Sequence, residues 1–378
     1  MRHRVFICSL LVTTLVAACA TRQGGSAGFV HARYAIEELD LPDEEKQDIV
    51  ACPADPRRSL AAYLVTRRGE VYALTPIQAR WTHTLIARVA GDRARIACGD
   101  AWPGNGPIPE LYLSAGRRLV MLAWRRGSWL PPLVLHEAAS PVRVRAAVGD
   151  VDPRWPGNEV YVSAGGLVQL AWNGRTWRTD TLPGPPGDVA VGDADQSVTG
   201  PELYVSGPGR TDQLRFGRGW VRRRIASVGT GLPQNAIIVG DADPTSPGQE
   251  VVLNWHATNV RGRVWLLARH PAEGWRSELV FAVGEGTPWT LHHLHDLAIE
   301  DFDPAVPGGE ILMAWSPVTH RPGRISLFAR RGYRWEHQLL WQDLDEAHGI
   351  AILSLPPGMR RALVAVGHPR DGVLLRIR

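Results

Sequence analysis

Short runs of alternating apolar and polar residues recur along the chain, separated by turn residues. In one unit the successive runs and turns are Glu159 to Ser163, Gly165-Gly166, Leu167 to Trp172, Asn173-Gly174 and Thr176 to Leu182. Alternation with a period of two is typical of a half-buried strand. Asn-Gly between two such runs indicates a hairpin, because a type I′ turn needs positive φ at both central residues. With the strand that precedes Gly149, the unit is predicted to hold four antiparallel strands and no helix.

The loop that opens this unit recurs as well. The stretch GDVDPRWPGNEVYV (149–162) returns as GDADQSVTGPELYV (192–205), GDADPTSPGQEVVL (240–253) and EDFDPAVPGGEILM (300–313), with looser copies at 99–113 and 51–65. A tryptophan marks the last strand of each unit: Trp81, Trp129, Trp177, Trp220, Trp275 and Trp335. Repeats of roughly 40 to 50 residues with four strands each are the signature of a β-propeller. We expect these tryptophans to pack between blades rather than to stack on a ligand.

The two ends of the chain complement each other. His348 to Arg378 supplies only three strands, whereas Phe29 to Leu39 precedes the first unit and matches Trp335 to Leu344 in phase. Pairing the N-terminal strand with the last blade would remove two exposed sheet edges. We therefore predict an all-β fold, a seven-bladed β-propeller of four-stranded antiparallel blades over residues 29–378, with residues 29–39 completing the last blade. A sandwich of two β-sheets is the alternative, but it does not explain the period.

The N-terminus has the pattern of an export signal. A basic head precedes an apolar segment, Val5 to Val16, that is too short to span a bilayer. Val16-Ala17-Ala18-Cys19 then resembles the lipobox of bacterial lipoproteins, which implies that Cys19 is lipidated and becomes the first mature residue. The alternative is an ordinary cleaved signal with an unrelated cysteine.

This resemblance sets the expected domain boundaries and location. We expect a signal peptide at 1–18, the lipidated Cys19 with a tether at 19–28, and the propeller from residue 29. Ala20, rather than Asp, follows the cysteine, so retention at the inner membrane is not signalled. The expected location is the cell envelope, lipid-anchored at the outer membrane.

Composition argues against nucleic acid as a partner. The net charge is only +4, Lys46 is the only lysine, and the arginines are dispersed, so nucleic acid is not expected as a partner.

Cys52 and Cys98 fall at nearly equivalent points of successive repeats. In a compartment that permits disulfides they either form one or remain two buried thiols.

The recurring acidic loop is a candidate calcium site. Its GDxDPxxPGxE pattern resembles FG-GAP/VCBS-like propeller repeats and is similar to the repeats in the propeller of rhamnogalacturonan lyases, which implies a propeller scaffold with structural calcium. Calcium takes six to eight oxygen ligands. The candidate ligands are Asp150, Asp152, Glu159, Asp193, Asp195, Glu202, Asp241, Asp243, Glu250, Asp301, Asp303 and Glu310. The alternative is that these aspartates accept hydrogen bonds from loop amides as Asx-turns.

Longer loops in blades five to seven form the predicted ligand face. The candidate ligand-binding residues are Trp255, His256, Arg261, Arg263, Trp289, His292, His295, Trp315, His320, Arg321 and His348. Indoles stack on sugar rings and guanidinium groups pair with carboxylates, so the expected partner is an acidic glycan or an envelope protein with an acidic segment. The histidines of HHLHD are alternatively buried in a strand, or hold Zn²⁺ with Asp296 or His348.

Two functions fit this sequence. The first is a lipid-anchored, non-enzymatic binding or scaffold propeller of the bacterial cell envelope. The second is a polysaccharide-acting enzyme, a lyase on acidic glycans, with His295, His348 and Arg321 as the base, acid and charge stabiliser. Only the repeat pattern matches the lyases, so the catalytic residues are unknown.

The lipidation hypothesis yields the first testable prediction. Replacing Cys19 with Ser removes the acylation site, and we expect the protein to move from the membrane fraction to the soluble fraction of the cell envelope, since acyl chains supply about 0.8 kcal/mol of membrane affinity per buried methylene. Cell fractionation followed by immunoblotting measures this change. Unchanged membrane retention of the variant would contradict the hypothesis.

Overall fold

The computed structural model describes most of the chain after the predicted tether. The described residues are 34–39, 41–58, 61–77, 80–142, 144–227, 236–257, 260–282, 293–302, 306–316, 323–344, 347–353, 362–367 and 372–377. Cys19 and residues 29–33 lie outside them. Within these ranges the chain forms thirty strands and one short 3-10 helix, η1 (Pro103–Asn105). No helix in this part of the chain is long and apolar enough to cross a membrane.

The described strands form seven four-stranded antiparallel sheets and one small hairpin. The first four sheets, in chain order and from inner to outer strand, are β2 (Lys46–Ala51), β3 (Ala62–Thr66), β4 (Glu70–Ile77) and β5 (Arg80–Arg88); β6 (Arg95–Gly99), β7 (Glu110–Ala115), β8 (Arg118–Leu122) and β11 (Leu133–Glu137); β12 (Ala147–Gly149), β13 (Glu159–Ser163), β14 (Leu167–Trp172) and β15 (Trp177–Leu182); and β16 (Asp188–Gly192), β17 (Glu202–Gly207), β18 (Arg210–Phe216) and β19 (Trp220–Ala226). The hairpin of β9 (Trp124–Arg125) and β10 (Ser128–Trp129) extends the second sheet.

The remaining three sheets follow the same plan. They are β20 (Ile237–Gly240), β21 (Glu250–Ala257), β22 (Val260–His270) and β23 (Gly274–Ala282); β24 (His293–Glu300), β25 (Glu310–Ser316), β26 (Gly323–Arg331) and β27 (Arg334–Leu344); and β28 (Ala347–Leu353), β29 (Ala362–Gly367) and β30 (Gly372–Ile377) with β1 (Tyr34–Glu38). The prediction of an all-β propeller of four-stranded antiparallel blades is confirmed.

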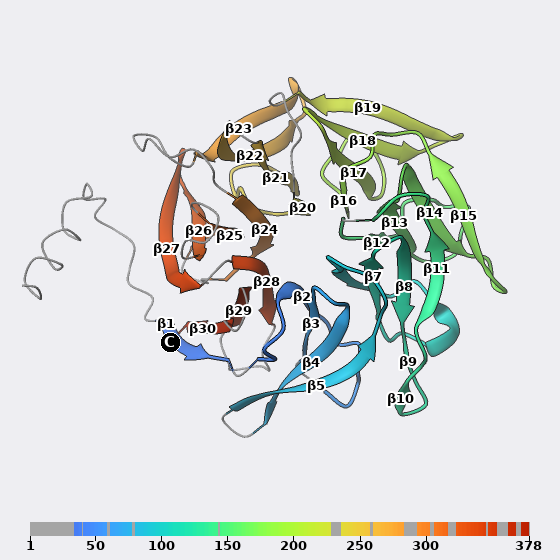
Figure 1. Cartoon of the computed structure of the whole chain (residues 1–378). Helices are drawn as coiled ribbons and strands as arrows, with labels where there is room; N and C mark the ends of the chain where they lie inside the picture. The colour runs from blue at the N-terminus through green and yellow to red at the C-terminus, as the bar shows by residue number, and fades with distance from the viewer. Residues whose placement is uncertain are drawn as a thin grey trace, which may run out of the picture. The chain divides into compact units, whose positions relative to one another are not determined.

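The inner strands form a closed ring around a central axis (Figure 1). β2, β6, β12, β16, β20, β24 and β28 each contact the next, and β28 also contacts β2. The sheet of β28, β29 and β30 takes its outer strand from the other end of the chain: Tyr34 lies opposite Ile377 and Glu38 opposite Val373. In the described residues this strand covers 34–38, a shorter span than the predicted 29–39.

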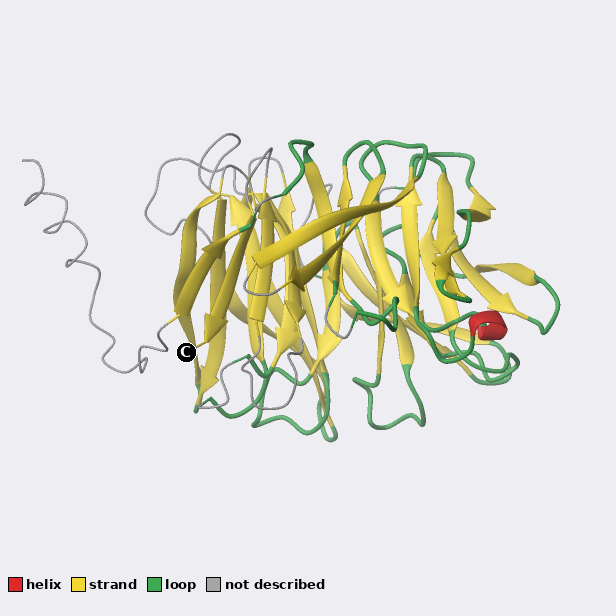
Figure 2. Ribbon diagram, turned by 90° about the horizontal axis from the view of Figure 1, so that it is seen from below, coloured by secondary structure: helices red, strands yellow, loops and turns green. Residues whose placement is uncertain are grey.

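All strands run between two faces that carry the loops (Figure 2). Each inner strand begins at one face and ends at the other, where the sequence of the first six blades continues into a copy of the recurring acidic loop. We call the face where the inner strands begin the pocket face and the opposite one the acidic-loop face. The turns between the second and third strands lie on the pocket face, and those between the third and fourth strands lie on the acidic-loop face.

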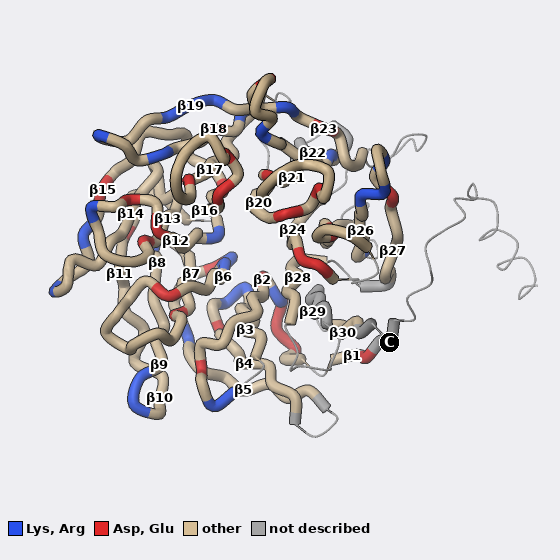
Figure 3. Tube along the Cα trace, turned by 180° about the vertical axis from the view of Figure 1, so that it is seen from behind, with Lys and Arg blue, Asp and Glu red and all other residues tan. Residues whose placement is uncertain are grey.

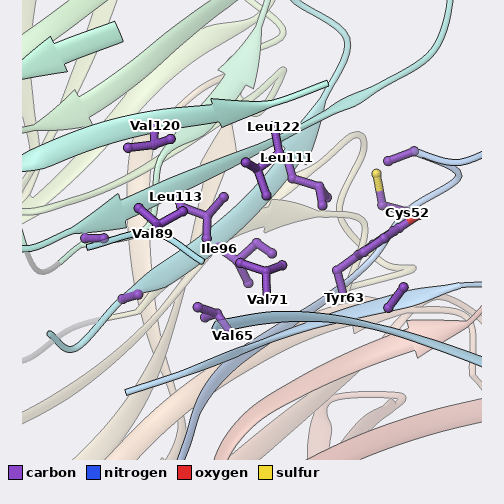
Figure 4. Packing of buried hydrophobic residues seen from close by; sticks show 14 of the residues in the cluster. Cys52, Tyr63, Val65, Val71, Val89, Ile96, Leu111, Leu113, Val120 and Leu122 are labelled. Carbon is purple, nitrogen blue, oxygen red and sulfur yellow. The ribbon is translucent and has the colours of Figure 1, made fainter. Parts of the chain in front are cut away.

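The core consists of apolar layers between neighbouring blades. Figure 4 shows one such layer, in which Val65 and Val71 of the first blade meet Ile96 and Leu111 of the second. The tryptophans of the outer strands complete these layers. Trp129 packs edge-on against Tyr63 with ring centroids 5.7 Å apart, and Trp220 and Trp275 meet Tyr161 and Tyr204 at 6.2 and 6.0 Å. Each pair joins adjacent blades, which confirms the packing interpretation of these tryptophans.

Glycines bring the inner strands close together. A Cβ atom built on Gly99 would lie 2.5 Å from the side chain of Val148, and on Gly149 it would lie 2.4 Å from that of Val191. Gly192 meets Val239 in the same way at 2.3 Å. The glycine that opens the repeat motif is therefore required for close approach of the next blade.

A disulfide joins the first two blades. Cys52, which follows β2, is bonded to Cys98 of β6, with their Cα atoms 6.2 Å apart. Closing a loop of this length restricts the unfolded chain, and such a bond typically stabilises a fold by about 2 to 4 kcal/mol.

The pairing of β1 with β30 gives the second prediction. In a chain that starts at Cys19, deleting residues 20–40 removes β1 and the buried Leu39 side chain. Loss of that side chain alone costs about 2 kcal/mol, so we expect a lower melting temperature by circular dichroism. A chain lacking only residues 20–33, which end just before β1, is the control and should melt like the parent. Equal melting temperatures for both deletions would contradict the closure.

Candidate functional site

A pocket of about 710 Å³ lies at the pocket face, where the inner strands begin. It draws lining residues from nearly every blade because the inner strands converge there. The residues that come from the starts of inner strands or just precede them are Gln47, Arg95, Arg145, Asp188, Ala236, Ile237, His295, Asp296 and His348. Loops of the first four blades form much of the wall, so the pocket is wider than the ligand face predicted on blades five to seven.

Arg145 forms the polar floor of this pocket. It directly precedes β12, and its guanidinium reaches across to two carboxylates. Nε donates to Oδ2 of Asp48 at 3.1 Å, Nη1 and Nη2 donate to the two carboxylate oxygens of Asp296 at 3.0 Å each, and Nη2 also donates to Oδ1 of Asp48. Arg145 thus joins the first, third and sixth blades.

The same two carboxylates also connect neighbouring inner strands. Oδ2 of Asp48 accepts the Ile96 N–H of the next blade at 3.0 Å, and Oδ2 of Asp296 accepts the Ile350 N–H at 3.0 Å. Both aspartates are buried and follow a register shift in their strand. A buried carboxylate needs such partners, because an unpaired one carries a large desolvation cost.

Burial and neighbouring charges have opposite effects on the pKa values of the residues in this floor. Burial lowers the pKa of Arg145, but the charges of Asp296 and Asp48 outweigh it and raise the pKa well above its ordinary value. Burial raises the pKa of Asp296, against the influence of Arg145. It also raises the pKa of Asp188 to about 7, although Arg95 and Arg145 oppose that shift. Arg145 therefore remains charged, while Asp188 titrates near neutral pH.

Further arginines lie at the pocket rim. Arg67 donates to Glu45 at 2.9 Å, and Arg95 donates to the backbone carbonyl of Gln47 at 3.2 Å. Arg93 lies in a left-handed backbone conformation with φ of 52°. Among the described residues, neither Arg93 nor Arg95 forms an ion pair. These two guanidinium groups are placed to pair with an anionic group of a ligand.

Two of the predicted ligand-binding histidines lie in the pocket. The rings of His295 and His348 have centroids 4.9 Å apart and planes inclined by 56°. They lie beside Asp296 in the lining. Across the part of the chain that the structure describes, no group of three or more His, Cys, Asp or Glu side chains has an arrangement that could hold a metal ion.

Two further predicted ligand-binding residues, Trp315 and Arg263, have described side chains and do not line the pocket. Trp315 is only 4% exposed, and its indole N–H donates to Ser326 at 2.9 Å. Trp315 is therefore a packing residue of the core in this structure, and the ligand-binding role predicted for it stays a prediction. Arg263 lies in β22 opposite Trp255. Trp289, His292, His320 and Arg321, and the side chains of Trp255, His256 and Arg261, lie outside the described residues.

Sequence reasoning missed the charged position that forms the pocket floor. Four residues before the start of successive repeat motifs stand Arg95, Arg145, Asp188, Ala236 and Asp296, and Asp48 stands three residues before the looser copy at 51–65. A charge at the same place in five repeats, just before an apolar inner strand, was the available signal. Structurally equivalent positions of a propeller form a ring around the axis, so these side chains converge.

Five of the acidic loops end at a buried glutamate. In the third blade, Oε2 of Glu159 accepts the N–H groups of Val151 and Asp152 at 3.0 and 3.2 Å and the Tyr161 hydroxyl at 2.7 Å. Glu110, Glu202, Glu250 and Glu310 occupy the same position and are also buried. Burial raises the pKa of Glu110, Glu159, Glu202 and Glu250 to about 7.

The second aspartate of each loop accepts local hydrogen bonds. Asp152 accepts the Arg154 N–H at 3.1 Å and Gln169 Nε2 at 3.1 Å. Asp195 accepts the Ser197 N–H, and Asp243 accepts the Thr245 N–H. These are the bonds that the Asx-turn alternative predicts.

The remaining calcium candidates are placed differently. The first aspartates, Asp150, Asp193, Asp241 and Asp301, are exposed. Asp303 lies outside the described residues. The calcium site stays a prediction.

The fold defines the chain as a β-propeller, and comparison with known proteins agrees. No family model and no curated protein matches the chain. The WD40 β-propeller domain of Doa1 superposes with a TM-score of 0.56 at 11% identity, covering 91% of this chain and 97% of that domain. The β-propeller domain of Cps50 (Swd1) from Myceliophteria thermophila gives 0.56 at 11% identity, covering 90% and 99%. BBS1N in complex with ARL6DN gives 0.54 at 12% identity, covering 90% and 97%. At these identities the likeness establishes the fold alone.

The buried glutamates give the third prediction. Their pKa in the folded protein is raised to about 7 from an ordinary value of 4.5, so the folded state binds more protons than the unfolded chain between these values. Their contribution to stability is fully present below pH 4.5 and is lost as the pH rises toward 7. Glu159→Gln keeps an oxygen acceptor but cannot ionise. We expect the variant to gain stability relative to the parent between pH 5 and pH 8.

Melting temperatures at the two pH values measure this difference. Glu137→Gln is the matched control, because the Glu137 side chain is 56% exposed. A difference between Glu159→Gln and the parent that is independent of pH would show that this carboxyl does not titrate in the window.

Proposed function

We propose that the protein is a non-enzymatic binding or scaffold propeller of the bacterial cell envelope, held at the membrane by lipid on Cys19. Its ligand site is the pocket at the pocket face. The observation that carries the proposal is the presence of Arg93 and Arg95, without ion pairs among the described residues, at the rim of a pocket of about 710 Å³. A pocket of this size with a few convergent polar groups is typical of a binding site.

The polar groups of the pocket favour a ligand with an acidic group. Arg145 is held by two carboxylates and shapes the floor, whereas Arg93 and Arg95 have donors left for a ligand carboxylate or phosphate. We therefore propose an acidic glycan or an acidic segment of an envelope protein as the partner. One similar propeller, BBS1N, was solved in complex with ARL6DN, which gives a precedent for protein binding by this architecture.

Two features of the sequence complete the proposal. The lipobox-like segment supports lipid anchoring, and the GDxDPxxPGxE pattern supports a repeat of the FG-GAP/VCBS type with calcium in its loops. Both are proposals that rest on the sequence.

One observation favours the enzymatic alternative. His295 and His348 lie side by side in the pocket, where one imidazole as base and one as acid would suit a lyase on acidic glycans. The charge stabiliser is the weak point of this alternative. Arg145, the nearest guanidinium to Asp296 in the floor, already pairs with Asp48 and Asp296, and Arg321 lies outside the described residues.

The fourth prediction tests the pocket. A glycan array with the mature protein identifies ligands, and product analysis of each ligand shows whether new unsaturated ends form. For a ligand found in this way, the double variant Arg93→Ala, Arg95→Ala is expected to bind at least tenfold more weakly by titration calorimetry, since a hydrogen bond to a charged group contributes about 1.5 to 3 kcal/mol.

Arg68→Ala is the matched control, because Arg68 is exposed on the same face but pairs with Glu44 and does not line the pocket. It should bind like the parent. Full affinity of the double variant would show that the pocket is not the ligand site. Cleavage of a bound glycan would favour the lyase, and an array without binding would favour a protein partner, to be sought by crosslinking in envelope extracts.

A further inference from the structure

The N-terminal strand starts on the face opposite the pocket. Glu38, at the end of β1, lies opposite Val373, and the next residue, Leu39, donates its N–H to the Gly372 carbonyl at 2.8 Å. The chain then crosses to Lys46, where β2 begins at the pocket face. Tyr34, at the other end of β1, therefore lies at the acidic-loop face, so a lipid tether would join the propeller there.

The same face carries a series of arginine-containing turns at its outer edge. Each joins the third and fourth strands of a blade, or the equivalent hairpin, and each contains an exposed arginine. The arginines are Arg126 between β9 and β10, Arg175 between β14 and β15, Arg218 between β18 and β19, and Arg334 at the start of β27. We call these turns the arginine rim. Figure 3 shows basic segments at the outer edge of the ring, in the β9–β10 hairpin and along β19.

Aromatic side chains flank these turns. Trp124 and Trp129 enclose the first turn, Trp172 and Trp177 the second, and their rings contact each other at 5.6 and 5.9 Å between centroids. Tyr333, in the turn before Arg334, is 92% exposed. Arginine and tyrosine together are typical of surfaces that contact the headgroup region of a membrane.

Charge is distributed unevenly over the acidic-loop face. The exposed aspartates of the loops, Asp150, Asp193, Asp241 and Asp301, directly follow the inner strands and therefore lie near the axis. The arginine rim lies at the periphery, on blades two, three, four and six. Contact with an anionic surface is consequently favourable at the rim, whereas a flat anionic surface pressed against the centre would be repelled.

We propose that the arginine rim docks on the anionic headgroups of a lipid bilayer, so that the acidic-loop face turns toward the membrane and the pocket face turns away from it. This orientation rests on the proposed membrane anchoring. Residues 20–33 reach at most about 50 Å when extended, which limits the distance from the bilayer but not the orientation. The arginine rim sets the orientation, because arginines near an anionic leaflet are attracted to its headgroups.

The experiment anchors the protein chemically, so that its outcome does not depend on lipidation in the cell. A chain that starts at Cys19 is coupled through that thiol to a maleimide lipid, in vesicles of phosphatidylcholine alone or with phosphatidylglycerol. Cys52 and Cys98 do not react because they form the disulfide. Hydrogen exchange measured by mass spectrometry then reports which amides the membrane covers.

We expect the turns of the arginine rim to exchange several-fold more slowly on vesicles that contain phosphatidylglycerol than on phosphatidylcholine alone. The pocket-face turns at Arg67 to Gly69 and Gly116 to Arg117 should exchange as in the free protein. The double variant Arg175→Ser, Arg218→Ser should lose much of the protection. The matched pair Arg68→Ser, Arg88→Ser, exposed at the pocket face, should keep it.

Protection of the pocket-face turns, or equal exchange at both faces, would overturn this orientation. Protection that is the same on neutral and anionic vesicles would overturn the role of the arginines. Neither result bears on lipid anchoring itself, which the fractionation of Cys19→Ser tests separately.

Discussion

Closing the ring requires a complete last blade, and the rest of this structure depends on that constraint. The last sheet has only three strands from the C-terminal segment, so β1 from the other end of the chain supplies the fourth. Without it, the backbone groups of β30 would form an exposed edge, which invites pairing with other chains. Every blade then packs against two neighbours, and no sheet can move outward without opening two apolar layers.

Closure also explains why charged side chains are tolerated at the centre. Asp48 and Asp296 are buried, yet each accepts a backbone N–H from the next blade and pairs with Arg145. Such a network adds little net stability compared with apolar packing, because desolvation offsets the attraction between the charges. The network instead specifies the arrangement of the blades, because the guanidinium can satisfy both carboxylates only when the first, third and sixth blades stand in their native order.

Much of the fold could be predicted because its signals are local. Alternating runs, Asn-Gly turns and the recurring acidic loop each lie within a few residues, and the tryptophans mark the blades directly. The pocket could not be predicted in this way. Arg145 is 97 residues from Asp48 and 151 from Asp296, and only the ring brings them together. The burial of Trp315 could not be predicted for a related reason: it adjoins a long loop in the sequence, but its place in the second strand of a blade directs it into the core.

The glycine that opens four of the six repeat motifs affects the whole assembly. It fixes the distance between one inner strand and the next, at Gly99 against Val148 and again at Gly149 against Val191. In a closed ring these distances add up to the inner circumference. A larger residue at one of these points would therefore not act only on its neighbour. It would push inner strands apart and so strain the hydrogen bonds by which Arg145 joins Asp48 to Asp296.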